Sequence, residues 1–126
     1  MREIYTYRGG PGMIAWALHR LAGLGVILFL ALHIFDIFLM QFGPETFNQL
    51  LFLYKHPLFR LMEIFLLFGL LYHALNGLRV ILLDLFPATA RFQMQLWYVQ
   101  MVIFAAAFIP LAVLMGIPIV RELFAV

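Results

Sequence analysis

Three long apolar windows constrain this chain more than any other feature of its sequence. They cover residues 21–40, 61–83 and 96–120, and each is long enough to cross about 30 Å of hydrocarbon as an α-helix of roughly 20 residues. A backbone in lipid has to satisfy its own hydrogen bonds, so such windows favour helices. The sequence therefore predicts an all-α membrane protein, a single domain over residues 1–126 with transmembrane helices at about 13–41, 57–86 and 94–120.

Composition agrees with this assignment and narrows the classes of function. With 66% hydrophobic and 11% charged residues, the chain has more apolar surface than a water-soluble core of this size could bury. A net charge of +2 without a basic cluster argues against nucleic acid as a partner. The absence of cysteine excludes a disulfide or a thiolate-bound iron–sulfur cluster within this chain.

The ends of the spans carry signals for location and topology. The polar, glycine-rich start does not resemble a signal peptide or an organelle transit sequence, so we expect a bacterial inner (plasma) membrane. Pro44 and Glu45 are suited to open a short interfacial helix, Pro57 to lie in the first turn of the second span, and Pro87 to end that span. Pro110, Gly116 and Pro118 are expected to bend the third span.

The distribution of basic residues predicts a cytoplasmic N-terminus. Arginine and lysine are enriched in cytoplasmic loops next to membrane spans. With the N-terminus inside, five basic residues lie on or near the cytoplasmic side and three on the other. The first group is Arg2, Arg8, Arg20, Arg79 and Arg91, and the second is Lys55, Arg60 and Arg121.

Several polar side chains interrupt the apolar spans and mark candidate functional sites. Ionisable groups at membrane depth cost about 2.5 to 3.5 kcal/mol on insertion scales, so they are functional by default. Three helices alone bury too little to hide them, and we therefore expect partner helices. The first span carries His19, Arg20, His33 and Asp36, and the second carries Glu63, His73, Asn76, Arg79 and Asp84.

His73 has the surroundings expected of a ligand to a flat macrocycle. Gly77 follows at i+4, so the same helical face offers an imidazole beside a position without a side chain. Asp84, eleven residues on, lies on the same stripe of the helix. A histidine hydrogen-bonded to a neighbouring helix would have the same pattern, and both interpretations stay open.

His33 raises the same question in the first span. Asp36 at i+3 could pair with its ring or with a loop beyond the helix end. If the first two spans are antiparallel, His33 and His73 differ in depth by roughly seven residues, or about 10 Å. They would then serve two different haems, each completed by a partner chain. The alternative is a polar group paired near the membrane surface.

The remaining polar residues lie near the predicted cytoplasmic end. His19 and Arg20 either snorkel to the surface or contact an anion, such as a haem propionate or a neighbouring carboxylate, beside a quinone head group. Arg79 and Asp84 fit the same two interpretations. Trp16 is expected in the interfacial aromatic belt and could also line a quinone pocket. His56 is expected to be solvated.

Two motifs resemble those of a known family. WALHRLAGLG, residues 16–25, resembles the first-helix signature of the cytochrome b subunit of succinate dehydrogenase, and HALNGLRVILLD, residues 73–84, resembles the second-helix signature. Their order, their spacing, the three-span plan and the chain length fit together. Two positions depart from the common pattern: Trp16 replaces a usual serine, and Val80 replaces a frequent histidine.

The resemblance implies a haem b-binding membrane anchor without catalytic residues of its own. It would pair with a second anchor subunit to form a haem-binding helical bundle below an iron–sulfur subunit and a flavoprotein, which hold the clusters and the FAD. His73 would be an axial ligand of haem iron. The haem propionate and quinone region would contain Trp16, His19, Arg20, Arg79 and Asp84.

FLALHIFD around His33 resembles the additional first-helix histidine of the di-haem branch, found in many menaquinone-using bacteria, and YRGGPGM resembles actinobacterial-type members of the family. We therefore expect two haems, with His33 as a ligand of the second, and menaquinone as the quinone; a single haem and ubiquinone are the alternatives. Two rival functions remain: a fumarate reductase anchor of the same architecture, and a non-redox subunit that relays protons through Glu63, His73 and Asp84.

Overall fold

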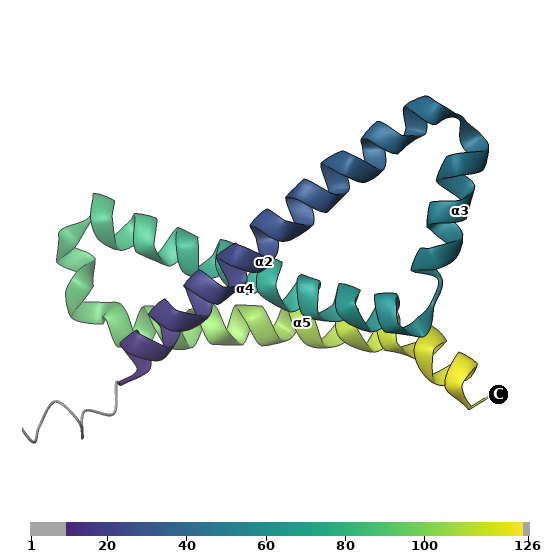
Figure 1. Cartoon of the computed structure of the whole chain (residues 1–126). Helices are drawn as coiled ribbons and strands as arrows, with labels where there is room; N and C mark the ends of the chain where they lie inside the picture. Colours follow the sequence, from purple (N-terminus) through teal and green to yellow (C-terminus); the bar gives the residue numbers. More distant parts are fainter. Residues whose placement is uncertain (1–9, 125–126) are drawn as a thin grey trace, which may run out of the picture.

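The computed structural model describes residues 10–124, which fold into helices joined by short turns (Figure 1). The long helices are α2 (Pro11–Leu39), α4 (Pro57–Leu85) and α5 (Gln93–Leu123), and α3 (Pro44–Tyr54) is shorter. Two 3-10 helices, η1 (Met40–Phe42) and η2 (Pro87–Phe92), lie at the turns. The all-α class is confirmed, and three helical segments are long and apolar enough to cross a membrane. The expected bounds differ from the observed ones by up to three residues.

Prolines and one glycine set most of the helix boundaries. Pro44 and Pro57 each occupy the first turn of a helix, as expected, because a missing N–H costs nothing there. Gly43 adopts a φ of 102°, a left-handed conformation that favours glycine, and so lets the chain turn into α3. His56 does not merely face solvent: its Nδ1 accepts a hydrogen bond from the N–H of Leu58 at 3.2 Å and caps α4.

Helix α4 is the centre of the fold because it packs against α2 on one side and α5 on the other. α4 and α5 run side by side, whereas α2 crosses α4 and then diverges from it (Figure 1). α3 joins the far ends of α2 and α4 and completes a triangle. The long helices thus form a row rather than a closed bundle.

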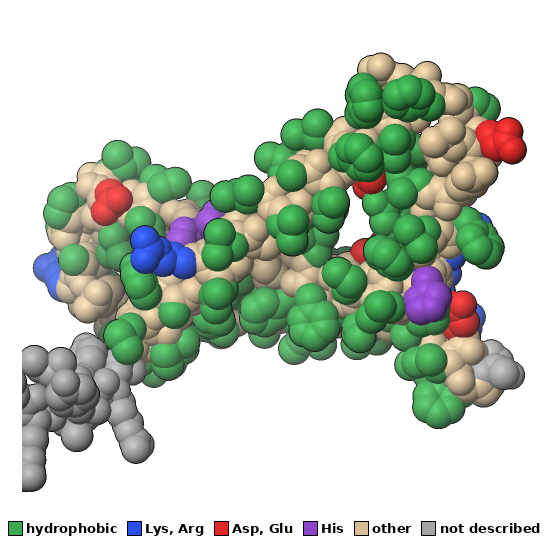
Figure 2. Space-filling view, viewed as in Figure 1, with side chains coloured by type: hydrophobic (Ala, Val, Ile, Leu, Met, Phe, Trp, Pro, Cys, Tyr) green, Lys and Arg blue, Asp and Glu red, His purple; other side chains and the backbone are tan. Residues whose placement is uncertain are grey.

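Aromatic rings fill the contact between α4 and α5. Phe68 and Tyr72 of α4 meet Phe104 and Phe108 of α5, with ring centroids 5.0 to 5.9 Å apart. Elsewhere the surface is largely hydrophobic (Figure 2), as lipid contact requires. The buried side chains are few: Ala15, Tyr72, Phe104, Ile119, Asn76 and Gln100.

Two polar contacts tie the elements together at the end of the molecule that holds α3. The hydroxyl of Tyr54 donates a 2.6 Å hydrogen bond to Asp36, so Asp36 pairs with a segment beyond its own helix. Burial raises the pKa of Tyr54 to about 12, with further contributions from the hydrogen bond and the negative charge of Asp36. Arg60 at the start of α4 forms a 3.0 Å ion pair with Glu122 at the end of α5.

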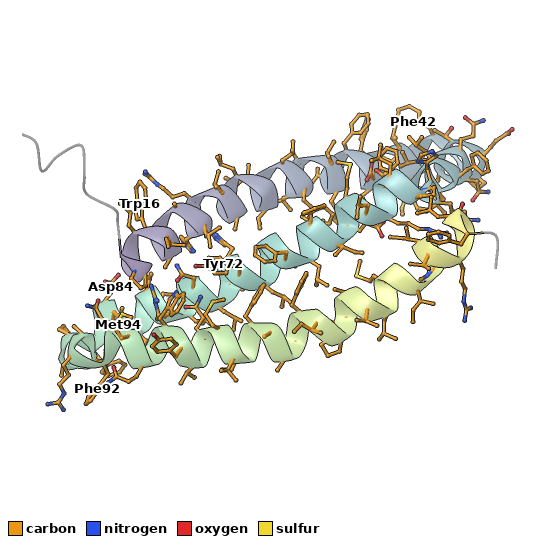
Figure 3. All side chains as sticks on the ribbon, turned by 90° about the horizontal axis from the view of Figure 1, so that it is seen from below. Trp16, Phe42, Tyr72, Asp84, Phe92 and Met94 are labelled. Atoms are coloured by element: carbon orange, nitrogen blue, oxygen red, sulfur yellow. The ribbon has the colours of Figure 1, made fainter. Side chains whose placement is uncertain are left out.

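Helix α5 continues through both of its internal prolines. Pro110 and Pro118 lie inside the 31-residue helix, and Gly116 lies between them. The ribbon of α5 curves towards its C-terminal end (Figure 3), in agreement with the expected bend. Proline removes one helical hydrogen bond and crowds the preceding turn, which accounts for curvature without a break.

Candidate functional site

His19 of α2 and His73 of α4 lie face to face where the two helices cross. Their ring centroids are 4.2 Å apart and the ring planes differ by 9°. Nδ1 of His73 also lies 3.2 Å from the main-chain carbonyl oxygen of His19. Both side chains are half-buried. The structure therefore brings together two histidines that sequence analysis assigned to separate roles.

The hydrogen bond determines which nitrogen of His73 is available to a ligand. A carbonyl oxygen can only accept, so Nδ1 carries the proton and Nε2 keeps its lone pair. This is the arrangement by which proteins orient a histidine that binds metal through Nε2. Within residues 10–124, no three His, Asp or Glu side chains are close enough to hold a bare metal ion. A metal at His73 would therefore need other ligands, such as those of a macrocycle.

Each of the two histidine rings packs against a glycine of the other helix. A Cβ at Gly23 of α2 would lie 3.0 Å from Cε1 of His73, a distance that real Cβ atoms rarely show. A Cβ at Gly77 would meet Cε1 of His19 at 3.7 Å, an ordinary contact. Gly23 therefore gives the His73 imidazole its room, and clearance for a macrocycle at Gly77 stays a prediction.

A second group of polar side chains lies on the neighbouring face of α4. Tyr72, Asn76 and Arg79 share this face by their spacing. Tyr72 and Asn76 are 1% and 2% exposed, and the Tyr72 hydroxyl donates to the carbonyl of Ala15 at 3.5 Å, a long contact. The buried Oδ1 of Asn76 and Nε of Arg79 have no hydrogen-bond partner among the described residues.

Helix α5, in which no motif was recognised from the sequence, also carries buried polar side chains. Gln100 is 5% exposed, and neither of its amide atoms has a partner within the described residues. Trp97, one turn earlier, has a buried indole nitrogen that also lacks a hydrogen-bond partner among the described residues. From the sequence, no functional role was assigned to Trp97 or Gln100. The available signal was an amide inside an apolar window, on the same helical face as an aromatic three residues before it.

Trp16, Arg20 and Asp84 do not join either group. The guanidinium of Arg20 lies over the Trp16 ring at 4.6 Å, a cation–π contact, and both residues are exposed. Asp84 is also exposed, and it forms no ion pair within residues 10–124. Trp16 and Asp84 lie at the same end of the molecule, opposite Phe42 (Figure 3). They are placed to contact something outside the chain at that end.

His33 lies in a groove enclosed by α2, α3 and α4. The groove has a volume of about 520 Å³, mostly apolar walls, and four polar residues in its lining. These are His33, Asp36, Tyr54 and Glu63. His33 is exposed and stacks on Phe29 with centroids 5.4 Å apart. Asp36 was expected to pair either with the His33 ring or with a segment beyond the helix end. It accepts a hydrogen bond from Tyr54 of α3, so the second of these is observed.

The two candidate ligands are further apart along the helix than the sequence suggested. His73 faces His19 and Gly23, whereas His33 lies ten residues beyond Gly23 on α2. At 1.5 Å per residue this is about 15 Å along the helix, rather than the expected 10 Å. The expected value of about 10 Å assumed that the first two spans meet with their ends level. The observed crossing of α2 and α4 does not have this alignment. One iron could not reach both histidines.

Two comparisons with known proteins bear on the family of this chain. Residues 2–113 match the family model described as the succinate dehydrogenase/fumarate reductase transmembrane subunit. The chain is also similar to the succinate dehydrogenase 2 membrane subunit SdhC of Mycobacterium tuberculosis (strain ATCC 25618 / H37Rv). The two are 41% identical over 112 residues, which cover 88% of this chain and 82% of the relative. The family match includes every candidate site residue described above.

Proposed function

Because the chain belongs to the succinate dehydrogenase/fumarate reductase transmembrane subunit family, we propose that it binds haem b and passes electrons to a membrane quinone. As a member of this family it is a membrane subunit of a larger enzyme complex, and the chemistry of succinate belongs to other subunits. We assign those roles to an iron–sulfur subunit and a flavoprotein with FAD. A second anchor subunit would complete the haem sites, in a bacterial inner membrane with the N-terminus cytoplasmic.

The orientation of His73 is the observation that carries this proposal. Its Nδ1–H is held by the carbonyl of His19, so the lone pair of Nε2 is directed to one ligand atom. Gly23, which has no side chain, leaves the room that the imidazole ring of His73 needs. Haem iron supplies one-electron redox chemistry, with a potential set by its axial ligands and surroundings. The other hydrogen-bonded histidine in the described residues, His56, accepts at Nδ1 and so does not leave Nε2 as the free acceptor.

The charged residues at the same end suit the edge of a haem and a quinone. Arg79 keeps a buried Nε without a partner, a donor suited to an anionic propionate or to a quinone oxygen. Arg20 and Trp16 together present a cation and an indole on the outer face of α2. We therefore place the propionate and quinone contacts among Trp16, Arg20 and Arg79, with Asp84 at the membrane surface; menaquinone is the expected quinone.

The groove around His33 supports a second haem. A histidine in a mostly apolar groove of about 520 Å³ fits an axial ligand whose macrocycle contacts hydrocarbon side chains. Asp36 and Glu63 in the same lining would repel propionates. We therefore expect the propionates of this haem to leave the groove rather than enter it.

The spacing of the acidic residues disfavours a proton relay through Glu63, His73 and Asp84. On α4 the first two are ten residues apart and the last two eleven, so each gap is about 15 Å along the helix. No side chain bridges such a distance directly. The family covers both succinate oxidation and fumarate reduction, and the similarity to a succinate dehydrogenase subunit favours the first direction.

The haem content of the purified complex tests this function. We expect two haems b per flavin in the wild type, and one in both His73→Ala and His33→Ala, because each variant removes one axial ligand. The measurement is the ratio of pyridine haemochrome to flavin, with reduced-minus-oxidised spectra to show that the two variants lose different haems. His56→Ala is the matched control, because His56 caps α4, does not line the groove at His33 and should leave two haems.

Two outcomes would contradict the proposal. Full haem content in a His73→Ala complex that retains its flavoprotein and iron–sulfur subunits would remove the assignment of His73. A wild-type ratio near one that His33→Ala leaves unchanged would remove the second haem and return His33 to a role at the surface of the groove.

A further inference from the structure

The same five-residue pattern occurs on both helices of the crossing and packs against itself. HRLAG at residues 19–23 and HALNG at residues 73–77 each place a glycine four residues after a histidine. Because α2 and α4 run in opposite directions, each histidine lies against the glycine of the other helix: His73 against Gly23 and His19 against Gly77. The two rings then stack between the glycines, 4.2 Å apart.

We propose that His19 is a positioning residue for His73: its carbonyl fixes the His73 tautomer and its ring fixes the His73 ring plane. The inference rests on the proposed function, in which His73 binds haem iron. It gives His19 a different role from the one that the family resemblance implied, which was contact with a propionate or a quinone. The haem would be affected by His19 only through His73.

Three contacts hold the His73 ring. The hydrogen bond to the carbonyl oxygen of His19 limits rotation about the ring bond, because turning the ring would break it. The stacked ring of His19 covers one face. The backbone at Gly23 approaches so closely that an added Cβ would lie 3.0 Å from Cε1 and 3.2 Å from Nδ1.

The two glycine–histidine contacts of the pattern differ in how tightly they hold the histidine ring, and this difference shows which histidine is positioned. The corresponding distance from Gly77 to His19 is 3.7 Å, an ordinary van der Waals contact that constrains the ring little. Nδ1 of His19 has no hydrogen-bond partner among the described residues, so no hydrogen bond at that atom holds the His19 ring. His73 is therefore the constrained ring, and His19 is its support.

Replacing His19 tests the role of its ring. Phenylalanine keeps a flat ring for stacking and lacks ring nitrogens, whereas alanine removes the ring; both keep the backbone carbonyl. In His19→Ala we expect a shifted midpoint potential and altered EPR g-values for the haem that His73→Ala removes, because the ligand ring gains freedom. In His19→Phe we expect both properties to return towards wild type. Equal disturbance in the two variants would mean that a ring nitrogen acts, and would overturn the inference.

Replacing Gly23 tests the same constraint from the other face. Gly23→Ala should shift the midpoint potential and the g-values of this haem, because the new methyl group forces the His73 ring to move. Gly116→Ala is the matched control: it makes the same change inside a helix, but its Cβ meets nothing within 4 Å. A Gly23→Ala complex with the spectrum and potential of Gly116→Ala would overturn the inference.

The results separate this inference from the proposed function. If His73→Ala keeps every haem, the ligand assignment itself is wrong. If His73→Ala loses a haem while His19→Ala and Gly23→Ala leave its potential and g-values unchanged, the ligand assignment stands and only the positioning role of His19 is wrong.

Discussion

At the scale of single residues, the candidate site is made of polar side chains inside apolar membrane spans. His73, His19, Arg79 and His33 stand out because polar groups in apolar spans are costly. Their pairing depends on how α2 and α4 are offset, and the periodicity of one helix carries no information about that offset. Gly23 was therefore overlooked, although its position four residues after His19 repeats the relation of Gly77 to His73.

Tyr54→Phe is predicted to weaken the connection between α2 and α3. It removes a 2.6 Å hydrogen bond to the carboxylate of Asp36, worth about 1 to 2 kcal/mol at a partly exposed site. The raised pKa of Tyr54 means that this contribution is complete below about pH 10 and is lost as the pH rises through about 12. Thermal unfolding of the complex should show a wild-type advantage that is constant from pH 7 to 9. Tyr98→Phe, at an exposed position of α5, is the control.

At the scale of elements, the helices were well predicted because proline marks their starts. Pro44, Pro57 and Pro87 fix three boundaries through a local effect that needs no tertiary contact. The contribution of α5 was not predictable in this way. Its aromatic contacts and the burial of Gln100 follow from which face it turns to α4, and a helix that is apolar on every side does not show that face.

Phe104→Ala is predicted to loosen the contact between α4 and α5. Phe104 is 5% exposed and meets Phe68, Tyr72 and Phe108. The unfolded reference in a bilayer is also apolar, so mainly the packing part of the cost remains, about 2 kcal/mol rather than the 3 to 5 kcal/mol of a soluble core. The thermal midpoint of the purified complex measures the loss. Phe65→Ala, 70% exposed, should leave that midpoint nearly unchanged.

At the scale of the whole molecule, the antiparallel order of the three spans was predicted, and the way they pack against one another was not. Three spans with short connections give antiparallel neighbours from the sequence alone. The divergence of α2 from α4, which opens the groove at His33, results from where the two helices cross. At that crossing two glycines and two histidine rings pack against one another, a contact between helices that the hydrophobic periodicity of either helix does not show.

Membrane orientation gives a prediction at this scale. Arg20, Arg79 and Arg91 support a cytoplasmic N-terminus, while Arg2 and Arg8, which strengthen that argument, lie outside the described residues. The chain has no cysteine, so single cysteines report cleanly. In intact cells, a membrane-impermeant maleimide should label Asn48→Cys on α3 but not Ala90→Cys on η2, both of which are exposed positions. Labelling of Ala90→Cys alone would reverse the orientation.

The central place of α4 has a consequence for the speed of electron transfer. A redox centre exchanges electrons quickly when its ligands hardly move between oxidation states, since little reorganisation energy then has to be supplied. His73 belongs to the helix that is held from both sides, by α2 and by α5. A haem bound there would be attached to a helix packed on two sides, whereas one bound through His33 would depend on the half of α2 that diverges from α4.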